Sequence, residues 1–406
     1  MNPVRGGGDA PRVVSAAERA TLATGMRLAV FSDTWLPQVN GVTRTLDRLV
    51  RAIRARGGEA KAYTTRDPGA GDDAEIVRYP SRPFWAYPQL QIARPDAAWA
   101  ARELAAFRPT LVHAATPFGI GLGGRSAARR LGIPLVTSYH TSLSAYAKFY
   151  HLGALSAPGW AFLRWFHNSG CRTYCPTRAI ERELAERDFT GTRIWSRGID
   201  ADRFAPSFRS SPLRAELGVS DDTFLVTYIG RIALEKGLDT LVRGMREIVA
   251  RAGTRRIAFA VAGDGPYDEA CRREAPAGTT FVGMISGDRL SAFYASGDLF
   301  VFPSVTDTFG NVLLEAMASG LPILGADSGP TRELLHDGRG ALFPAADASA
   351  MATEVLALAD DADRRSRLRD AGLAYARARS WDAIFDDLVL DYRSAIAASA
   401  TFIDHD

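Results

Sequence analysis

The stretch at residues 302–320, FPSVTDTFGNVLLEAMASG, joins an apolar strand end, a polar turn and a strong helix-forming run. Asp307 lies in the turn, and Glu315 follows eight positions later on the expected helix. A helix that begins near Gly310 points its free N–H groups and its positive dipole end toward that turn, which favours a phosphate there. Two carboxylates beside a phosphate would repel it, so we expect them to hold sugar hydroxyl groups.

Two cations follow another strand upstream. The run FLVTYIG (224–230) leads into Arg231 and Lys236 of GRIALEKG. Guanidinium and ammonium groups are suited to neutralising a diphosphate. A cation pair at the carboxyl end of a buried strand is more typical of a site than of a solvated surface. Together with the helix start and the hydroxyl acceptors, the pair predicts a nucleotide-sugar site.

Further candidates follow strands of the first half. His140 comes after PLVTSY and is assigned to the site, although a single histidine is more often structural. In FSDTWLPQVNGVTRTL (31–46), Asn40 and Gly41 let backbone amides approach the diphosphate, because glycine has no Cβ. Asp33 and Thr43 either touch a substrate or serve as turn and cap residues, and the sequence favours neither.

The length of 406 residues predicts two domains, each large enough for its own core. No apolar run reaches the roughly 18 residues that a membrane span needs. The first 25 residues are charged and lack the apolar core of a secretory signal, so we expect a loose extension with Met26 as the working start. Three cysteines show neither metal spacing nor an even count, which favours a reducing cytoplasm.

The net charge of +3 is unevenly distributed. Residues 1–203 contain 28 Lys+Arg and 17 Asp+Glu, whereas the remainder contains 21 and 29. A basic first half indicates an anionic partner such as acidic lipid headgroups. Because only three of the 49 basic residues are lysines, an arginine-rich proteome explains the excess equally well. Four arginines lie at roughly helical spacing and would form one basic helix surface: Arg44, Arg48, Arg51 and Arg54.

Short apolar runs alternate with amphipathic stretches in both halves, which predicts an α/β protein of two doubly wound domains facing across a cleft. The expected strands are 27–32, 110–115, 134–139 and 173–177, then 224–230, 256–263, 279–283, 298–304 and 321–327. Gly, Pro and mixed charge at 197–207 mark the junction. The predicted parts are an extension (1–25), an acceptor-side domain (26–198, completed by helix 382–400) and a donor-side domain (199–381).

Two motif matches are set aside. GIGLGG (119–124) fits the dinucleotide-binding glycine pattern, but Thr116-Pro117-Phe118 separates it from the strand, and no acid follows at about 20 residues. Asp200 and Asp202 form an Asp-x-Asp pattern typical of metal sites, but they lie in the junction and more plausibly cap or turn the chain.

The motifs, taken in order and spacing, resemble the retaining glycosyltransferases of family 4, which have the GT-B fold. The family signature is Glu, seven residues, Glu, then Ala-Met-Ala, and here it reads TDTFGNVLLEAMASGLP. The resemblance extends over residues 26–400. One departure is that the first acid is Asp307, one methylene shorter than Glu. It remains a hydrogen-bond acceptor, but its reach to the sugar hydroxyls changes.

The resemblance implies roles for individual residues. Asp307 would face the transferred sugar, Glu315 the nucleotide ribose and His140 the anomeric centre. Arg231 and Lys236 would hold the donor diphosphate, so neither a metal nor another cofactor is expected. The implied catalytic set is His140, Arg231, Lys236 and Asp307. The donor-binding set is Asn40, Gly41, Gly230, Arg231, Lys236, Met284, Asp307, Phe309, Gly310, Asn311, Val312 and Glu315. The acceptor candidates are Asp33, Thr43, Tyr139 and Tyr146.

Within the family, SYHTSLSAYAKFY, RWFHNSG and IWSRGIDADRF are most similar to bacterial α-mannosyltransferases that use GDP-mannose and act on glycolipids. The same stretches resemble sulfoquinovosyltransferases, which use a UDP-sugar to make an anionic lipid. The expected function is retaining hexose transfer, with GDP-mannose as the preferred donor and a glycolipid or cell-envelope glycan as the acceptor. The alternatives are a UDP-sugar-dependent transferase acting on diacylglycerol, a nucleotide-sugar 2-epimerase and a non-catalytic sugar-nucleotide sensor. We expect a cytoplasmic protein, peripheral on the inner face of the plasma membrane, without a nucleic-acid partner.

Overall fold

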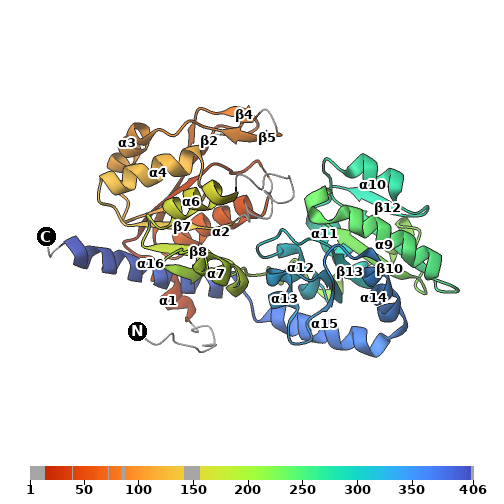
Figure 1. The fold of residues 1–406 in the computed structure, drawn as a ribbon. Coiled ribbons are helices and arrows are strands. Elements are labelled where there is room, and N and C mark those ends of the chain that lie inside the picture. The colour runs from red at the N-terminus through yellow and green to blue at the C-terminus, as the bar shows by residue number, and fades with distance from the viewer. Residues whose placement is uncertain (1–13, 39, 72, 85–86, 141–155, 404–406) are drawn as a thin grey trace.

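Two parallel β-sheets, each covered by helices on both faces, lie side by side in the computed structural model (Figure 1). The structure describes residues 14–38, 40–71, 73–84, 87–140 and 156–403. The first sheet is built from the N-terminal half of the chain and the second from the C-terminal half. This arrangement confirms the predicted pair of doubly wound domains.

The N-terminal sheet has seven parallel strands in the order β3-β2-β1-β6-β7-β8-β9. Their short apolar sequences are typical of strands buried on both faces. The strands are β1 (Arg27–Ser32), β2 (Glu59–Thr65), β3 (Ile76–Tyr79), β6 (Leu111–Ala114), β7 (Leu135–Ser138), β8 (Arg172–Cys175) and β9 (Thr192–Ile194). A separate antiparallel pair consists of β4 (Arg82–Phe84) and β5 (Tyr87–Ile92).

Successive β1 side chains enter two different cores, as the alternation of a strand requires. Leu28 and Val30 pack against one helical layer, formed by α2 and α16, whereas Ala29 and Phe31 pack against the other, formed by α3 and α4. The helices of this half are α1 (Ala16–Thr21), α2 (Gly41–Ala55), α3 (Ala97–Phe107), α4 (Gly119–Arg130), α6 (Ser156–His167), α7 (Arg178–Ala185) and α16 (Trp381–Ile403).

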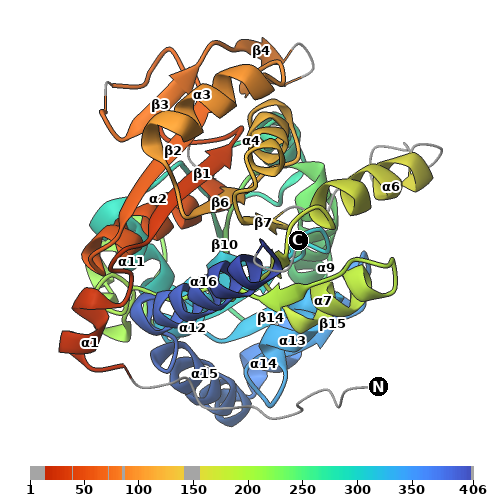
Figure 2. The ribbon, with the colours of Figure 1, turned by 90° about the vertical axis from the view of Figure 1, so that its left-hand side faces the viewer.

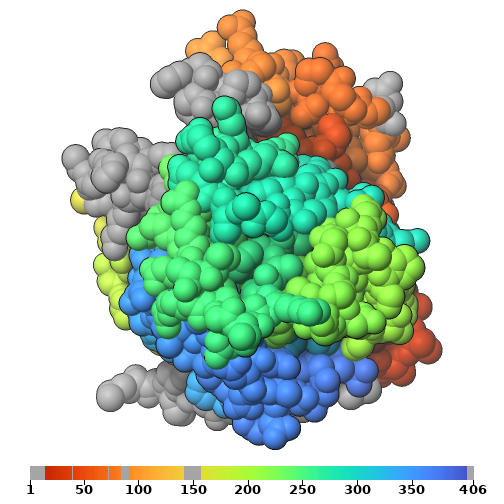
Figure 3. Space-filling view, turned by 90° about the vertical axis from the view of Figure 1, so that its right-hand side faces the viewer, coloured from red at the N-terminus to blue at the C-terminus, as the bar shows by residue number. Residues whose placement is uncertain are grey.

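The C-terminal sheet has six parallel strands in the order β12-β11-β10-β13-β14-β15. The strands are β10 (Phe224–Ile229), β11 (Ile257–Ala262), β12 (Thr280–Gly283), β13 (Leu299–Phe302), β14 (Ile323–Ala326) and β15 (Ala341–Phe343). Leu225 faces a core shared with α11 and α12, and Val226 faces the opposite core with α9 and α14. Figure 3 views this half from its outer side, with α14 and α15 (blue) along its lower part.

Helices of the C-terminal half follow its strands in the expected βα alternation. They are α8 (Ser211–Glu216), α9 (Leu238–Arg251), α10 (Asp268–Glu274), α11 (Gly287–Ser296), α12 (Asn311–Ala318), α13 (Gly329–Leu335), α14 (Ala348–Asp360) and α15 (Ala362–Arg377). Two 3₁₀ turns are η2 (Pro206–Phe208) and η3 (Leu234–Lys236). Among the helices of the described residues, none has both the length and the hydropathy of a membrane span.

The chain passes between the two halves twice, and the two passages lie against each other. Ile199 forms a parallel bridge with Ser380, and the Ile199 amide donates to the carbonyl of Arg379 over 2.8 Å. Gly198 belongs to the first passage. A methyl group on it would lie 2.5 Å from the backbone nitrogen of Trp381 in the second passage, so the close approach of the two passages requires a glycine here. After it, α16 packs on the N-terminal half (Figures 1 and 2).

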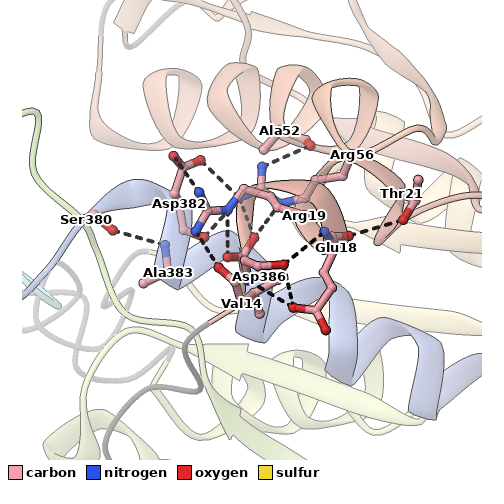
Figure 4. Close-up of polar contacts among 11 residues, drawn as sticks. Val14, Glu18, Arg19, Thr21, Ala52, Arg56, Ser380, Asp382, Ala383 and Asp386 are labelled. Atoms are coloured by element: carbon pink, nitrogen blue, oxygen red, sulfur yellow. Dashed lines mark hydrogen bonds and ion pairs between the residues drawn. The ribbon is translucent and has the colours of Figure 1, made fainter.

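The prediction of a loose N-terminal extension is wrong for residues 14–25. Helix α1 has a capping box between Ser15 and Glu18, and Ala23 lies in the N-terminal core. Arg19 donates to the Asp386 carboxylate over 2.8 Å, and Arg56 contacts the same carboxylate at 2.6 Å (Figure 4). Asp386 is 1% exposed, so this segment is tied to α16 by a buried charge.

Candidate functional site

The start of α12 lies at the carboxyl edge of the C-terminal sheet and has no side-chain cap from the described residues. Gly310 occupies the cap position with φ 81°, a left-handed conformation that glycine adopts without strain. Within the described residues, no side chain caps the helix, so its first amides are not satisfied by the usual Ser, Thr or Asp. A helix start of this kind provides N–H donors and a positive dipole end for an anion.

Cationic side chains lie beside this helix start because β10 and β13 are adjacent parallel strands, so the loops that follow them meet at one edge. Lys236 Nζ pairs with Asp307 Oδ1 at 2.8 Å, and Ser304 Oγ donates to Asp307 Oδ2 over 2.5 Å. Arg231 Nη1 lies 3.6 Å from Glu235 Oε1. The structure therefore pairs Lys236 with Asp307, and it places Arg231 beside Glu235, the residue before Lys236.

The first loop of the N-terminal half approaches α12. A methyl group at Gly41 would lie 3.2 Å from Asn311 Nδ2, so the Gly41 backbone comes close to the first residue of α12. Asn40 is engaged locally: its Oδ1 accepts from the Val42 and Thr43 amides, each over 2.9 Å, as the cap of α2. Of the predicted pair, only Gly41 turns its backbone toward the other half.

Glu315 lies one turn into α12 and faces cations of α2. It accepts a hydrogen bond from the Tyr294 hydroxyl over 2.8 Å. Burial raises the pKa of Glu315, while the bond from Tyr294 and the positive charges of Arg44 and Arg203 oppose that rise. Arg44 was expected on a lipid-facing surface, but its charge acts on Glu315, the ribose-binding candidate.

The remaining arginines of the basic α2 helix have partners within the protein. Arg48 stacks over the Trp381 ring with its Cζ 5.1 Å from the centroid. Arg51 pairs with Asp47 at 3.1 Å, and Arg54 pairs with Glu75 and donates to the carbonyl of Ala60. These contacts hold the three guanidinium groups within the protein, while the Arg51 side chain stays largely exposed, and the lipid-binding role of α2 stays a prediction.

His140 stands at the end of β7, where the two halves meet. Its carbonyl accepts from Thr308 Oγ1 over 2.9 Å, next to Asp307 in the C-terminal half. Both ring nitrogens have protein partners: Nε2 lies 2.7 Å from Ser138 Oγ, and Nδ1 lies 3.2 Å from Arg197 Nη2. Burial and then Arg197 hold the pKa of His140 well below its ordinary value. The ring is thus neutral and fully occupied.

Three residues that join the halves were missed by sequence analysis. Thr308 bonds to His140, and its own carbonyl accepts from Thr177 Oγ1 over 3.3 Å. Glu333 of α13 accepts from the amides of Arg178 (3.0 Å) and Ala179 (2.7 Å), the first two residues of α7. A carboxylate from one half therefore caps a helix of the other. No local sequence signal indicates such a cap, since its residues lie about 155 positions apart.

Two of the candidates for binding the sugar acceptor, Asp33 and Thr43, are helix-capping residues in the structure. Asp33 is a cap: its carboxylate accepts from Thr116 Oγ1 (2.6 Å) and from the Ile120 amide (2.7 Å) at the start of α4. This carboxylate occupies the helix start that GIGLGG would have offered a pyrophosphate. Thr43 is also a cap residue, buried and donating to the Gln38 carbonyl over 2.8 Å.

Tyr139 and Tyr146 complete the acceptor set. The Tyr139 ring is buried and stacks on Trp160 with centroids 6.5 Å apart, so it contributes to the packing of α6. Tyr146 lies outside the described residues.

The other members of the donor set lie around the same edge, with one correction. Met284, directly after β12, is 74% exposed, and Gly230 follows β10 with φ 156°. Val312 is half-buried on α12. Phe309 is 5% exposed and belongs to the apolar core, so its side chain packs inward and does not face a ligand.

No group of His, Cys, Asp and Glu within the described ranges is arranged to hold a metal ion. Asp200 accepts the backbone amides of Arg203 and Phe204 at its carbonyl, as in a turn. The placement of Asp200 and Asp202 at the crossing between the halves agrees with the turn interpretation.

Comparison with known proteins identifies the family. Residues 39–203 match the model of Glycosyltransferase Family 4, and residues 223–361 match that of Glycosyl transferases group 1. A GDP-mannose-dependent alpha-mannosyltransferase of Mycobacterium tuberculosis is 33% identical over 378 residues, with 91% of this chain and 97% of the relative covered. The chain belongs to glycosyltransferase family 4. The sequence resemblance is thereby confirmed.

Relatives of the family differ in the donors and products that their names give. Sulfoquinovosyl transferase SQD2 of Arabidopsis thaliana is 31% identical over 377 residues, covering 89% of this chain and 72% of that protein. Among solved structures, sucrose-phosphate synthase of Thermosynechococcus elongatus aligns with a TM-score of 0.74 at 21% identity, covering 92% of this chain and all of that one. The structural similarity shows the GT-B fold, and the sequence similarity shows a glycosyltransferase.

Proposed function

We propose that this chain is a retaining, metal-independent hexosyltransferase that moves mannose from GDP-mannose to a hydroxyl group of a glycolipid or cell-envelope glycan. The observation that carries the proposal is the convergence of an uncapped helix start at Gly310, the cations Arg231 and Lys236, and the Gly41 backbone of the other half. Positive charge from these groups suits a departing nucleoside diphosphate.

The proposed reaction takes place on one face of the sugar. The acceptor oxygen forms a bond to the anomeric carbon on the side from which the diphosphate leaves, and the bond from that carbon to the phosphate oxygen breaks. The acceptor proton passes to the departing phosphate oxygen. Arg231, Lys236 and the α12 amides absorb the developing charge, and Asp307 holds sugar hydroxyls. Closure of the two halves would exclude water from the reacting groups.

The donor preference rests on the relatives. Mannosyltransferases that use GDP-mannose and a sulfoquinovosyl transferase are similar to this chain at nearly equal identity, 33% and 31%. A UDP-sugar-dependent transferase acting on diacylglycerol is therefore the second candidate. A thermal-shift screen of GDP-mannose, UDP-glucose, UDP-sulfoquinovose and free nucleotides separates them, because a bound donor raises the melting midpoint. Stabilisation by UDP-sugars alone would exclude the mannosyl proposal.

Substitution of Arg231 tests the diphosphate role. Arg231→Ala removes a charge-assisted contact to the leaving group, so transfer should fall on the order of 100-fold. Arg243→Ala is a matched control, because Arg243 also pairs with an acid four positions away along the chain but lies on the surface of α9. An NMR spectrum of the product reports the anomeric configuration. An unchanged rate in Arg231→Ala, or an inverted product, would count against the mechanism.

We further propose that α6 and the end of α4 form the surface that meets an anionic membrane. On α6, Phe162 and Trp165 are exposed, Trp165 to 51%, and Figure 2 shows this helix projecting from the N-terminal half. Arg125 of α4 is itself buried and stacks on Trp165 with its Cζ 3.7 Å from the ring centroid, and the exposed arginines at the end of that helix are Arg129 and Arg130. Exposed aromatic rings bordered by arginines suit an acidic bilayer surface.

Flotation with vesicles tests this surface. Phosphatidylglycerol vesicles should retain the protein more strongly than phosphatidylcholine vesicles, and Phe162→Ser with Trp165→Ser should reduce retention about tenfold or more. Val249→Ser with Leu234→Ser removes exposed apolar residues from the other half and should leave retention unchanged. Equal loss in both pairs would contradict a role for α6.

A further inference from the structure

The hydrogen-bond partners of His140 determine where its ring proton lies. Arg197 Nη2 lies 3.2 Å from His140 Nδ1. A guanidinium group only donates, so Nδ1 must be the acceptor. In a neutral ring the proton then lies on Nε2, from which it is donated to Ser138 Oγ at 2.7 Å.

The same reasoning extends through the core to α16. Because Ser138 Oγ accepts from His140, its single proton is donated to His113 Nε2 at 2.8 Å. His113 therefore carries its proton on Nδ1 and donates to the Tyr392 hydroxyl at 2.7 Å. In the series from Arg197 to Tyr392, each group therefore donates its hydrogen bond to the next one. The guanidinium group at the start fixes this direction of donation, because it can only donate.

Arg197 is held in place independently of His140. The residue is 6% exposed, and its Nη1 donates to the carbonyls of Trp195 (2.6 Å) and Ser196 (3.2 Å). Within the described residues, no carboxylate pairs with it, and residues 141–155 contain no Asp or Glu. A second positive charge on the adjacent ring would be costly in this buried place.

Among the described residues, each charged or titratable group that faces His140 disfavours its protonated form or is itself neutral. Arg197 approaches from the crossing segment, His113 from β6 and His167 from α6, and all three lower the pKa of His140 after burial itself. Thr308, which bonds to the His140 carbonyl, and the Trp195 ring, 5.6 Å away, carry no charge.

We propose that Arg197, Ser138 and His113 are positioning residues that hold His140 as the neutral Nε2–H form, so that its ring transfers no proton in the reaction. The inference rests on the proposed glycosyl transfer and assigns His140 a binding and alignment role. His140 joins a rigid series of bonds in one half to Thr308, the neighbour of Asp307, in the other. The acceptor proton must then pass to the leaving phosphate oxygen.

Histidine ¹⁵N spectra of the full chain test the tautomer without any substrate. The His140 signals, assigned with His140→Gln, should show a protonated Nε2 and an unprotonated Nδ1 that do not change between pH 5 and 8. In Arg197→Met, Nδ1 loses its donor, so the proton is no longer confined to Nε2 and the two ¹⁵N signals should move toward the average of the two neutral tautomers. A wild-type ring that is protonated on Nδ1 or titrates near its ordinary value would overturn the proposal. This measurement is independent of the donor, so it also decides the point if no nucleotide sugar is turned over.

Kinetics give the second readout. Arg197→Met and Ser138→Ala should lower kcat about 10- to 100-fold through misplacement of His140, while the melting shift produced by the donor persists. The kcat/KM pH profile of the wild type should show no histidine inflection between pH 5 and 8. Arg197→Lys retains a donor and should restore part of the rate.

Arg187→Met is the control. It removes an arginine that stacks on Trp160, and its kcat should match that of the wild type. A wild-type profile with a histidine inflection that disappears in His140→Gln would contradict the positioning role.

Discussion

At the scale of single residues, the ion pair between Lys236 and Asp307 defines the state of the unliganded site. The two atoms are 2.8 Å apart and both side chains are largely buried. A diphosphate that binds Lys236 must share or displace the carboxylate, and the sugar hydroxyls can take the lysine's place on Asp307. Asp307 thus links the binding of the donor diphosphate to the orientation of the sugar.

Asp307→Asn tests this link. Loss of the carboxylate frees Lys236, so free nucleoside diphosphate should bind a few-fold more tightly, as expected for an ion pair of about 1 kcal/mol. Transfer should fall at least tenfold, because Asn cannot offer the sugar a charged acceptor. Asp327→Asn breaks a 2.7 Å pair with Arg332 in the same half and should change neither quantity. Weaker nucleotide binding in Asp307→Asn would contradict the shared-lysine model.

Buried histidines make stability depend on pH. Burial lowers the pKa of His113 and of His167 to about 3, below the ordinary value of 6.5. Between these values the unfolded chain binds more protons than the folded one, so the free energy of unfolding falls as pH falls from about 6.5 toward 3. Each such histidine contributes up to about 1.4 kcal/mol per pH unit.

Denaturant unfolding from pH 7 to pH 5 checks this dependence. His167→Gln should give a shallower loss of stability than the wild type. His336→Gln, at an exposed position, should leave the slope unchanged. The same slope in all three proteins would show that His167 is not buried in its neutral form.

At the scale of elements, the start of α12 depends on the backbone of Gly310. Gly310→Ala forces a side chain into a left-handed conformation, which costs about 1–2 kcal/mol, and the new methyl would lie 3.2 Å from Phe302 and Leu313. Donor KM should rise on the order of tenfold as the amides shift. Gly338→Ala has a similar φ of 73° and open space, so it should cost stability alone. Unchanged donor KM in Gly310→Ala would remove α12 from the site.

Helix α7 depends on a cap from the opposite half. Glu333→Ala removes the acceptor for the Arg178 and Ala179 amides, so hydrogen exchange at these amides should accelerate and stability should fall by about 1 kcal/mol. Small-angle scattering should show a broader distribution of arrangements of the two halves. Asp347→Ala removes the cap of α14 within one half and should destabilise without changing the scattering. Identical scattering for both variants would limit Glu333 to a local role.

At the scale of the whole molecule, the first and the last helix of the described residues, α1 and α16, both pack on the N-terminal half. Asp386 of α16 receives Arg19 from the N-terminal segment and Arg56 from the end of α2 (Figure 4). Helix α16 starts just after the second passage between the halves, so this cluster fixes α16 next to that passage.

Arg19→Ala should destabilise the protein by about 1–3 kcal/mol, because the buried Asp386 loses one of its two charged donors. Thermal and urea unfolding measure the loss. Arg255→Ala breaks a surface pair with Asp360 and is the control, for which only a small change is expected. If the two variants are equally stable, residues 14–25 do not contribute to the fold.

The sequence by itself determined the architecture and the donor edge. Strands such as β1 and β10 coincide with apolar runs, because a strand buried on both faces needs a continuous apolar sequence. The position of Gly310 between strand and helix was likewise visible, since local conformation depends on neighbouring residues. Strands β2 and β9 were not predicted, because their sequences mix polar and apolar residues.

The tertiary structure decided what each polar side chain bonds to. Asp33 caps α4, Glu333 caps α7, and both ring nitrogens of His140 are occupied. These partners lie far apart in the sequence, except Ser138, and hydrogen bonds form only at distances near 3 Å. Chain folding alone brings such atoms together, so a motif indicates the chemistry of a residue type, and the packed structure determines which residues remain available for it.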